Sequence, residues 1–299
     1  MQKVFIAGCG YIGERIARVY LDSGADVTCL VRSPENGSRL ESAGYTTVIA
    51  TLDDPATLPI VSLASSVLFY LAPPPGGGIA DSRARNFIAR MAEWGKPLKF
   101  VYMSATSVYS GGDGVVTEES PAAPDSAMGK RRLDAETAFL EYGAAQNVPV
   151  VILRVSGIYG PGRLPLMQIS QGQPLLNEDE SGPSNRIHAD DLTTVTIAAA
   201  EKGMAGDIYN ISDGHPSSMT SYFNACADIL DFPRQPQVTM AEAHKVMSPL
   251  MLSYVSQSRI IDNSRMLERL GVKLRYADLS EGLAASLPPH QTQSGKQSA

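Results

Sequence analysis

Hydrophobic residues in the first half of the chain gather in short runs that alternate with stretches of helical spacing. The first run, residues 4–7, is entirely apolar, as a strand buried on both faces must be. Ile12, Ile16 and Tyr20 then recur at the spacing of one helix face. Further strand-like runs cover residues 27–31, 46–50, 67–72, 100–103, 148–153 and 207–211, and helical patterns cover 128–145 and 190–202. This alternation predicts an α/β fold, a doubly wound parallel sheet of the Rossmann type, with ligands at the carboxyl ends of its strands.

The regular alternation loosens after about residue 160, where Pro161, Gly162 and Pro165 interrupt it. We therefore predict a Rossmann domain over residues 1–162, which residues 186–212 rejoin. Residues 163–185 and 213–287 are predicted to form a smaller, mostly helical C-terminal cap. The polar residues 288–299 lack the hydrophobic positions that a packed element needs, so we expect a disordered tail there.

Charge and composition argue against several classes of protein. The formal net charge is −6 and no run rich in Lys or Arg occurs, which disfavours a nucleic-acid partner. No apolar run approaches the roughly 20 residues that span a bilayer, and the first residues lack the basic region of a signal peptide. Cys9, Cys29 and Cys226 do not have the spacing of a zinc site or of a disulfide framework. We therefore expect a cytoplasmic monomer or homodimer that binds a small molecule, without a membrane or a metal.

A glycine cluster follows the first strand directly and matches the pattern G-x-G-x-x-G: Gly8-Cys9-Gly10-Tyr11-Ile12-Gly13. In such a turn Gly8 permits the tight bend, Gly10 lets backbone N–H groups approach a pyrophosphate, and Gly13 lets the helix pack close to the strand. The helix that begins here adds partial positive charge. The cluster therefore predicts a dinucleotide site that includes Gly8, Gly10, Tyr11, Ile12 and Gly13. A glycine turn without a ligand is the alternative.

The end of the second strand bears on which dinucleotide is bound. An NAD site usually places an acid there for the ribose hydroxyls, but this chain has Arg32 and Ser33, with no acid until Glu35. A guanidinium and a hydroxyl suit a 2′-phosphate through charge-assisted hydrogen bonds. We therefore predict NADP as the cofactor, with NAD as the alternative. In a third interpretation Arg32 is a solvated surface residue.

Several later segments together resemble the extended short-chain dehydrogenase/reductase superfamily, which contains nucleotide-sugar epimerases and dehydratases. The segments are Ser107-Val108-Tyr109, Thr117-Glu118, residues 154–162 (RVSGIYGPG), residues 186–191 (RIHADD), Tyr209-Asn210, Leu270-Gly271 and Glu281-Gly282-Leu283. Residues 70–75 (YLAPPP) resemble an atypical bacterial branch, described as predicted nucleoside-diphosphate-sugar epimerases. The resemblance implies that Leu71, Ala72 and Pro73 contact the cofactor. It also implies that Tyr109, Arg154, Arg163 and Arg186 contact the substrate, although a buried salt bridge is the alternative for Arg154.

The active-site positions depart from this family's pattern of a Ser or Thr followed by Tyr-x-x-x-Lys. Counting from the matching segments places Ala105 at the serine, Met128 at the tyrosine and Arg132 at the lysine position. Met128 cannot exchange a proton, and Arg132 is always protonated. The spacing of four still puts Met128 and Arg132 on one helix face, so Arg132 could reach the nicotinamide ribose.

Other residues are candidates for the missing catalytic groups. Ser104 and Thr106 flank Ala105 and could hydrogen-bond a substrate, and His188 is a candidate proton donor. In the alternative interpretation His188 caps the helix that follows it. The resemblance implies an NAD(P)-dependent epimerase, dehydratase or reductase on a nucleotide-sugar-like substrate. Our candidates for its catalytic centre are Arg132 and these three residues. The replaced positions favour a second hypothesis, a non-catalytic NADP-binding redox sensor or regulator.

Overall fold

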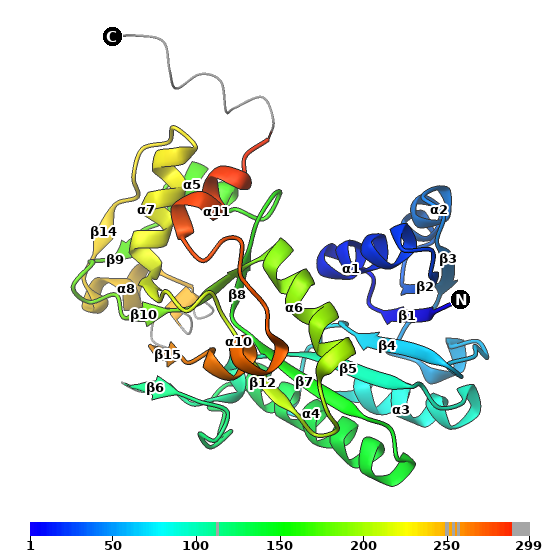
Figure 1. The fold of residues 1–299 in the computed structure, drawn as a ribbon. Helices are drawn as coiled ribbons and strands as arrows, with labels where there is room; N and C mark the ends of the chain where they lie inside the picture. Colours follow the sequence, from blue (N-terminus) through cyan, green and yellow to red (C-terminus); the bar gives the residue numbers. More distant parts are fainter. Residues whose placement is uncertain (112–113, 249–250, 253–254, 256–257, 289–299) are drawn as a thin grey trace.

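The computed structural model describes residues 1–288 except 112–113, 249–250, 253–254 and 256–257 (Figure 1). Its centre is a seven-stranded parallel sheet in the order β12-β7-β5-β4-β1-β2-β3. The strands are β1 (Lys3–Ala7), β2 (Asp26–Val31), β3 (Thr46–Ile49), β4 (Ser66–Tyr70), β5 (Lys99–Ala105), β7 (Val150–Val155) and β12 (Ile208–Ile211). Each strand falls on one of the apolar runs, and the predicted Rossmann sheet is confirmed. The predicted tail lies, except for Pro288, outside the described residues.

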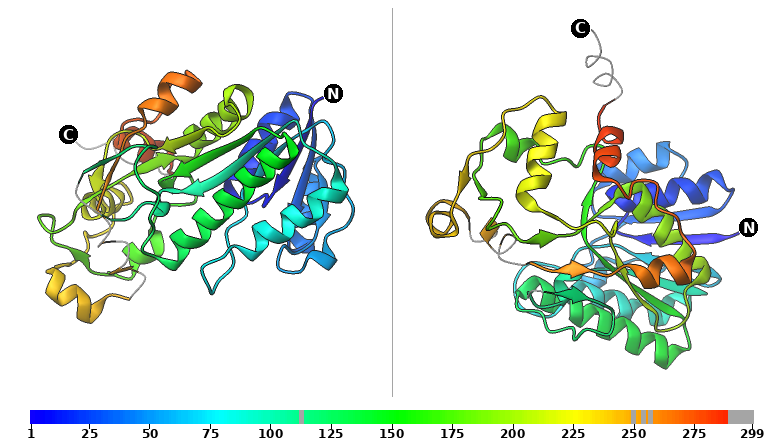
Figure 2. Two further views of the ribbon diagram at one scale, coloured as in Figure 1. Left: turned by 90° about the horizontal axis from the view of Figure 1, so that it is seen from below. Right: turned by 60° about the vertical axis from the view of Figure 1, so that its left-hand side comes forward.

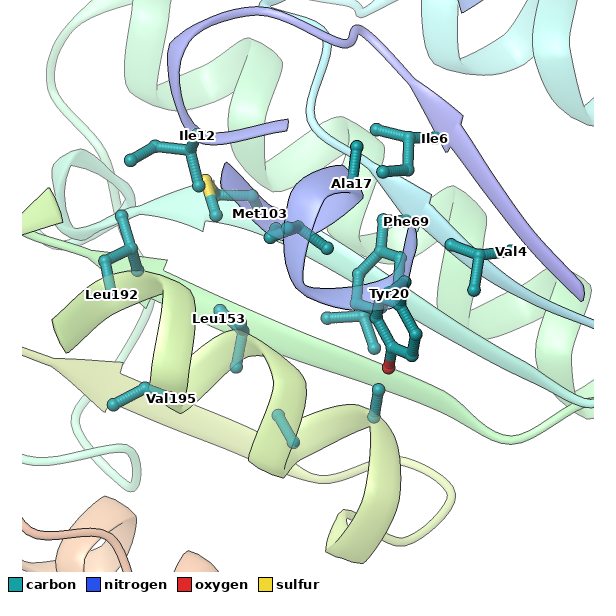
Figure 3. Close-up of a cluster of buried hydrophobic side chains, with 14 of the residues drawn as sticks. Val4, Ile6, Ile12, Ala17, Tyr20, Phe69, Met103, Leu153, Leu192 and Val195 are labelled. Atoms are coloured by element: carbon teal, nitrogen blue, oxygen red, sulfur yellow. The ribbon is translucent and has the colours of Figure 1, made fainter. Parts of the chain in front are cut away.

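Helices cover both faces of the sheet (Figures 1 and 2). One face carries α1 (Tyr11–Asp22), α2 (Pro34–Ser42) and α6 (Ala189–Lys202), and the other carries α3 (Ser82–Trp94) and α4 (Ala127–Gln146). Figure 3 shows the core of the first face, where Ile12 and Tyr20 of α1 and Leu192 of α6 meet strand residues such as Leu153. Apolar positions on two helix faces and on the sheet therefore place α1 beside α6.

The C-terminal region is mixed rather than mostly helical. It contains α5 (Leu166–Ser170), α7 (Met219–Ile229), α8 (Met240–Val246) and α11 (Leu279–Ala285). It also contains two-residue strand pairs: β9 (Leu175–Leu176) with β14 (Gln237–Val238), and β10 (Pro183–Ser184) with β13 (Ser217–Ser218). Such short pairs form between distant segments, so no local pattern predicts them. Helix α10 (Ser264–Leu270) lies within the predicted cap but buries Met266 and Leu270 in the core with α6.

Segments that leave the sheet at its carboxyl edge connect the two regions. After β5 the chain forms the 3-10 turn η2 (Thr106–Val108), and after β7 it forms β8 (Gly157–Tyr159), which pairs with β11 (Arg186–His188). Strand β6 (Val115–Val116) pairs in the same way with β15 (Ile260–Ile261). These connections hold the cap over the ends of β5 and β7.

Candidate active site

A cavity of about 430 Å³ lies at the carboxyl ends of β1, β2 and β4. Of the predicted cofactor residues, its wall includes Gly8, Gly10, Arg32, Ser33, Ala72 and Pro73. It also includes Cys9, Leu30, Val31, Asn36, Leu52 and Arg83. Leu71 does not line the cavity; its side chain lies against the start of α1, 3.3 Å from the place where a Cβ on Gly13 would be. The predicted loop and the end of β2 therefore meet around one cavity.

Each glycine of the loop has a different structural reason. Gly8 has φ +91°, and a Cβ there would lie 2.6 Å from the backbone nitrogen of Ala72. A Cβ on Gly13 would lie 3.0 Å from the carbonyl oxygen of Gly8, so this glycine allows close packing of α1. A Cβ on Gly10 would meet no protein atom within 4 Å, because Gly10 faces the cavity. Gly8 and Gly13 therefore serve the fold, whereas Gly10 leaves open space in the cavity.

The start of α1 offers backbone donors to this cavity. Gly10 is the N-cap residue, and no side chain among the described residues caps the helix. The first N–H groups of a helix have no partner within it, so those of Tyr11, Ile12 and Gly13 are available to an anion. The side chain of Ile12 is buried in the core, and the Tyr11 hydroxyl donates to the carbonyl of Pro161 at 2.9 Å. The side chains of Tyr11 and Ile12 are thus used within the protein, and neither these two residues nor Gly13 line the first cavity.

A second cavity, of about 520 Å³, lies beyond the ends of β5 and β7. It contains the predicted residues Ala105, Thr106, Met128, Arg163 and Arg186. The other lining residues are Ser107, Val155, Ser156, Gly157, Ile158, Tyr159, Ser184, Asn185, Met219, Tyr222, Phe223 and Arg259. Ala105 and Met128, which the sequence predicts at the family's Ser and Tyr positions, thus line the same cavity. The cap supplies the opposite wall through α7.

Met128 reaches this wall because the first turn of α4 packs tightly on η2. Ser126 caps the helix by accepting a hydrogen bond from Gly129 N at 3.0 Å. A Cβ on Gly129 would overlap the carbonyl oxygen of Ser107, so a larger residue would push the two elements apart. Met128 remains 43% exposed beside the cavity. Arg132, one turn later, donates to the carbonyl of Met103 at 3.0 Å and does not line either cavity.

Three of the predicted site residues form a buried network instead of a cavity wall. Arg154 donates to Glu136 Oε2 at 2.8 Å and to the hydroxyl of Tyr109 at 2.8 Å. Ser104 donates to Glu136 Oε1 at 2.6 Å, and Tyr109 donates to Asn210 Oδ1 at 2.8 Å. The side chains of Arg154 and Glu136 are 5% and 2% exposed. The structure therefore places Arg154 in a buried salt bridge, which was the alternative interpretation. The hydroxyls of Ser104 and Tyr109 are hydrogen-bonded in the same network.

His188 is also buried and does not line either cavity. Its Nδ1 accepts a hydrogen bond from Asp190 N at 3.2 Å and so caps α6. Its ring centroid lies 4.1 Å from that of Tyr276, and burial lowers the pKa of the imidazole, which favours the neutral ring. This position supports the capping role of His188 rather than that of a proton donor to substrate.

Arg186 carries a buried positive charge on the wall of the second cavity. It is 7% exposed and donates to Ser184 Oγ at 2.9 Å and to Ser217 Oγ at 2.8 Å. Its guanidinium lies 4.2 Å from the ring centroid of Tyr222. Among the described residues, no carboxylate lies within 4.0 Å of this guanidinium. Asp213 interacts with this guanidinium electrostatically from a longer distance.

Sequence reasoning missed residues on both cavity walls. Asn36 and Arg83 in the first cavity, and Tyr222 and Arg259 in the second, belong to segments without a recognised motif. Asn36 had a weak local signal, since it stands three residues after Ser33 and donates its N–H to that side chain at 3.1 Å.

In the described part of the chain no helix is long and apolar enough to cross a membrane, and no three His, Cys, Asp or Glu side chains gather as metal ligands would.

Comparison with known proteins agrees with the fold. In sequence, dTDP-D-glucose 4,6-dehydratase of Homo sapiens is 32% identical over 130 residues, which cover 40% of this chain and 37% of the dehydratase. The chain thus matches little more than a third of that relative. In structure, a functionally unknown conserved protein from Silicibacter pomeroyi has a TM-score of 0.80 at 26% identity, over 95% of this chain and 98% of the other.

UDP-glucuronic acid 4-epimerase from Bacillus cereus, solved in complex with NAD, has a TM-score of 0.74 at 21% identity, over 95% of this chain and 97% of the epimerase. The family model described as NAD dependent epimerase/dehydratase matches residues 4–212, which include the seven-stranded sheet apart from Lys3 and all the residues that line the first cavity. The chain belongs to the NAD dependent epimerase/dehydratase family.

Proposed function

We propose that the protein is an NADP-dependent oxidoreductase of the epimerase, dehydratase or reductase type, acting on a nucleotide-sugar-like substrate with a non-standard proton relay. The observation that carries this proposal is the placement of a dinucleotide cavity and a second, arginine-lined cavity at the ends of neighbouring strands β4 and β5. A bound NADP would exchange a hydride with a substrate in the second cavity. The epimerase from Bacillus cereus, which holds NAD, supports a dinucleotide in the first.

The dinucleotide site is tested by closing the open space at Gly10. Because a Cβ at Gly10 would meet no protein atom within 4 Å, Gly10→Val should fold normally and lose binding of NADP and NAD alike. Binding is measured by calorimetry, and folding by the thermal melting curve. A Gly10→Val protein that binds either dinucleotide as well as the parent would contradict the assignment of the phosphate loop.

The preference for NADP rests on Arg32 and Ser33, which both line the first cavity. Ser33 uses its oxygen to cap α2, so its hydroxyl hydrogen is still available for a phosphate. Arg32→Ala should weaken NADPH binding by about 1.5–3 kcal/mol and change NADH binding little. Arg234→Ala, at an exposed arginine paired with Asp228 in the cap, is the matched control. Equal affinities of the parent for both cofactors would refute the preference.

The substrate class rests on Arg163 and Arg186 in the second cavity, with Tyr222 stacked on Arg186. Planar guanidinium groups suit the oxygens of a diphosphate. Of the candidate catalytic residues, Thr106 lines this cavity, and its hydroxyl would hydrogen-bond the reacting part of the substrate. The Arg186→Gln variant should bind UDP- and dTDP-sugars more weakly than the parent does. Unchanged affinity would remove Arg186 from the substrate site.

A second candidate function is a binding-only NADP-dependent regulator, which is favoured by Ala105 and Met128 on the cavity wall. A triple variant decides between the two: Ala105→Ser, Met128→Tyr and Arg132→Lys restore the family's residues. NADPH oxidation and NADP reduction are followed against a panel of nucleotide sugars. A positioned acid–base group is worth about 10²–10⁴-fold in rate. Turnover in the triple variant alone favours the regulator, whereas turnover in the parent that the triple variant lowers favours an enzyme with a rearranged proton relay.

A further inference from the structure

Arg83, at the start of α3, lies on the wall of the dinucleotide cavity together with Arg32. Its Nε and Nη2 donate to the two carboxylate oxygens of Asp53 at 2.6 and 2.9 Å, and its Nη1 donates to the carbonyl of Pro73 at 3.1 Å. The side chain is 15% exposed. Segments after β3 and after β4 therefore hold this guanidinium in one orientation at the cavity.

The guanidinium keeps donors for a ligand in spite of these contacts. An arginine has five N–H donors, and the hydrogen bonds to Asp53 and Pro73 use three of them, one on each nitrogen. Within the described part of the chain, one N–H on each of Nη1 and Nη2 has no hydrogen-bond acceptor. A pair of N–H groups at the fork of a guanidinium is the arrangement that binds two oxygens of a phosphate.

The charges around this part of the cavity also favour a phosphate. Arg83 and Arg32 both lower the pKa of Asp53, the hydrogen bond from Arg83 being the larger cause, so the carboxylate is ionised and lies near both cations. Two arginines and one carboxylate leave a net charge of about +1. A phosphate monoester carries about −1.5 to −2 at pH 7, whereas the ribose hydroxyl of NAD is neutral. The oxygens of Asp53 already accept from Arg83, which makes them poorer acceptors for a ribose hydroxyl.

We infer that Arg83 is a second determinant of cofactor choice, which binds the 2′-phosphate of NADP together with Arg32 while Asp53 and Pro73 hold its guanidinium in place. This inference rests on the proposed dinucleotide site. The choice between NAD and NADP is usually attributed to a residue at the end of β2. Arg83 adds a residue from a helix about 50 positions further along the chain.

The test compares binding of NADP, NAD and 2′,5′-ADP to the full chain by calorimetry. Arg83→Gln should raise the Kd of NADP and of 2′,5′-ADP by roughly 10- to 100-fold, as expected for loss of a charged hydrogen bond, and the Kd of NAD by less than about threefold. Arg83→Lys keeps the charge without the fork and should fall between the parent and Arg83→Gln. Arg85→Gln is the matched control, because Arg85 lies on the same helix as Arg83, pairs with Asp134 of α4 and does not line the cavity.

The outcomes separate this inference from the proposed function. If Arg32→Ala reduces the preference of the parent for NADP and Arg83→Gln does not, the NADP site stands and the role of Arg83 is refuted. If Arg83→Gln weakens NADP and NAD equally, Arg83 supports the cavity without reading the 2′-phosphate, which also refutes it. If the parent prefers NAD, both the NADP proposal and this inference fail, while the dinucleotide site stands.

Discussion

The buried pair of Arg154 and Glu136 allows a sharp test of whether Arg154 serves the fold or a substrate. In Arg154→Leu the carboxylate of Glu136, 2% exposed, loses the partner whose Nη2 lies 2.8 Å away. Removing one partner of a buried ion pair costs about 3–5 kcal/mol, because the remaining charge stays in a medium of low dielectric. We therefore expect the free energy of unfolding to fall by about 3–5 kcal/mol.

The assay is equilibrium unfolding in urea. The chain has one tryptophan, Trp94, which is 2% exposed at the end of α3, so its fluorescence reports on the sheet core. The double variant Arg154→Leu with Glu136→Leu removes both charges and should be more stable than Arg154→Leu alone. A loss below about 1 kcal/mol in Arg154→Leu would refute the argument. Loss of nucleotide-sugar binding at unchanged stability would return Arg154 to the substrate site.

Further predictions concern the loop, a buried carboxyl and a helix cap. Gly8→Ala should lower the melting temperature and cost about 1–3 kcal/mol of stability, because Gly8 has φ +91° and a Cβ there would lie 2.6 Å from the backbone nitrogen of Ala72. Gly10→Ala should melt like the parent. Equal melting temperatures of the two variants would be contrary evidence. Burial raises the pKa of Asp213 to about 6 from 3.8, so the folded protein holds this proton more tightly than the unfolded chain and loses stability as pH rises through 6. Asp213→Asn lacks that loss and should gain about 3 kcal/mol on the parent between pH 3.5 and pH 7.5 in urea titrations; a constant difference across this range would count against it. At His188, Asn keeps a hydrogen-bond acceptor for the first turn of α6 and Ala does not. The free energy of unfolding of His188→Ala should therefore be about 1 kcal/mol lower than that of His188→Asn, with a lower urea midpoint. Equal midpoints would argue against the cap.

Local patterns were sufficient to predict the parallel sheet and its phosphate-binding turn. Strands buried on both faces must be apolar throughout, so residues 4–7 and the other runs mark them without reference to the rest of the chain. The glycine pattern can be recognised locally, and Gly13 packs against the carbonyl of Gly8 within the same turn, although the backbone that Gly8 itself approaches is that of the distant Ala72. The family resemblance follows the same ordered elements, which is why the fold could be predicted before its contacts were known.

The roles of single polar residues were decided by tertiary contacts. Arg154 is 18 residues from Glu136, and Arg83 is 30 residues from Asp53, so no spacing in the sequence indicates either pair. The short strand pairs of the cap and the packing of α10 on α6 have the same origin. A polar side chain at the end of a strand can turn to a cavity or to a buried partner, and the choice depends on which distant charge the packed helices bring within hydrogen-bond distance. For this reason the sequence predicts where the sites lie, whereas the folded chain decides which side chains line them.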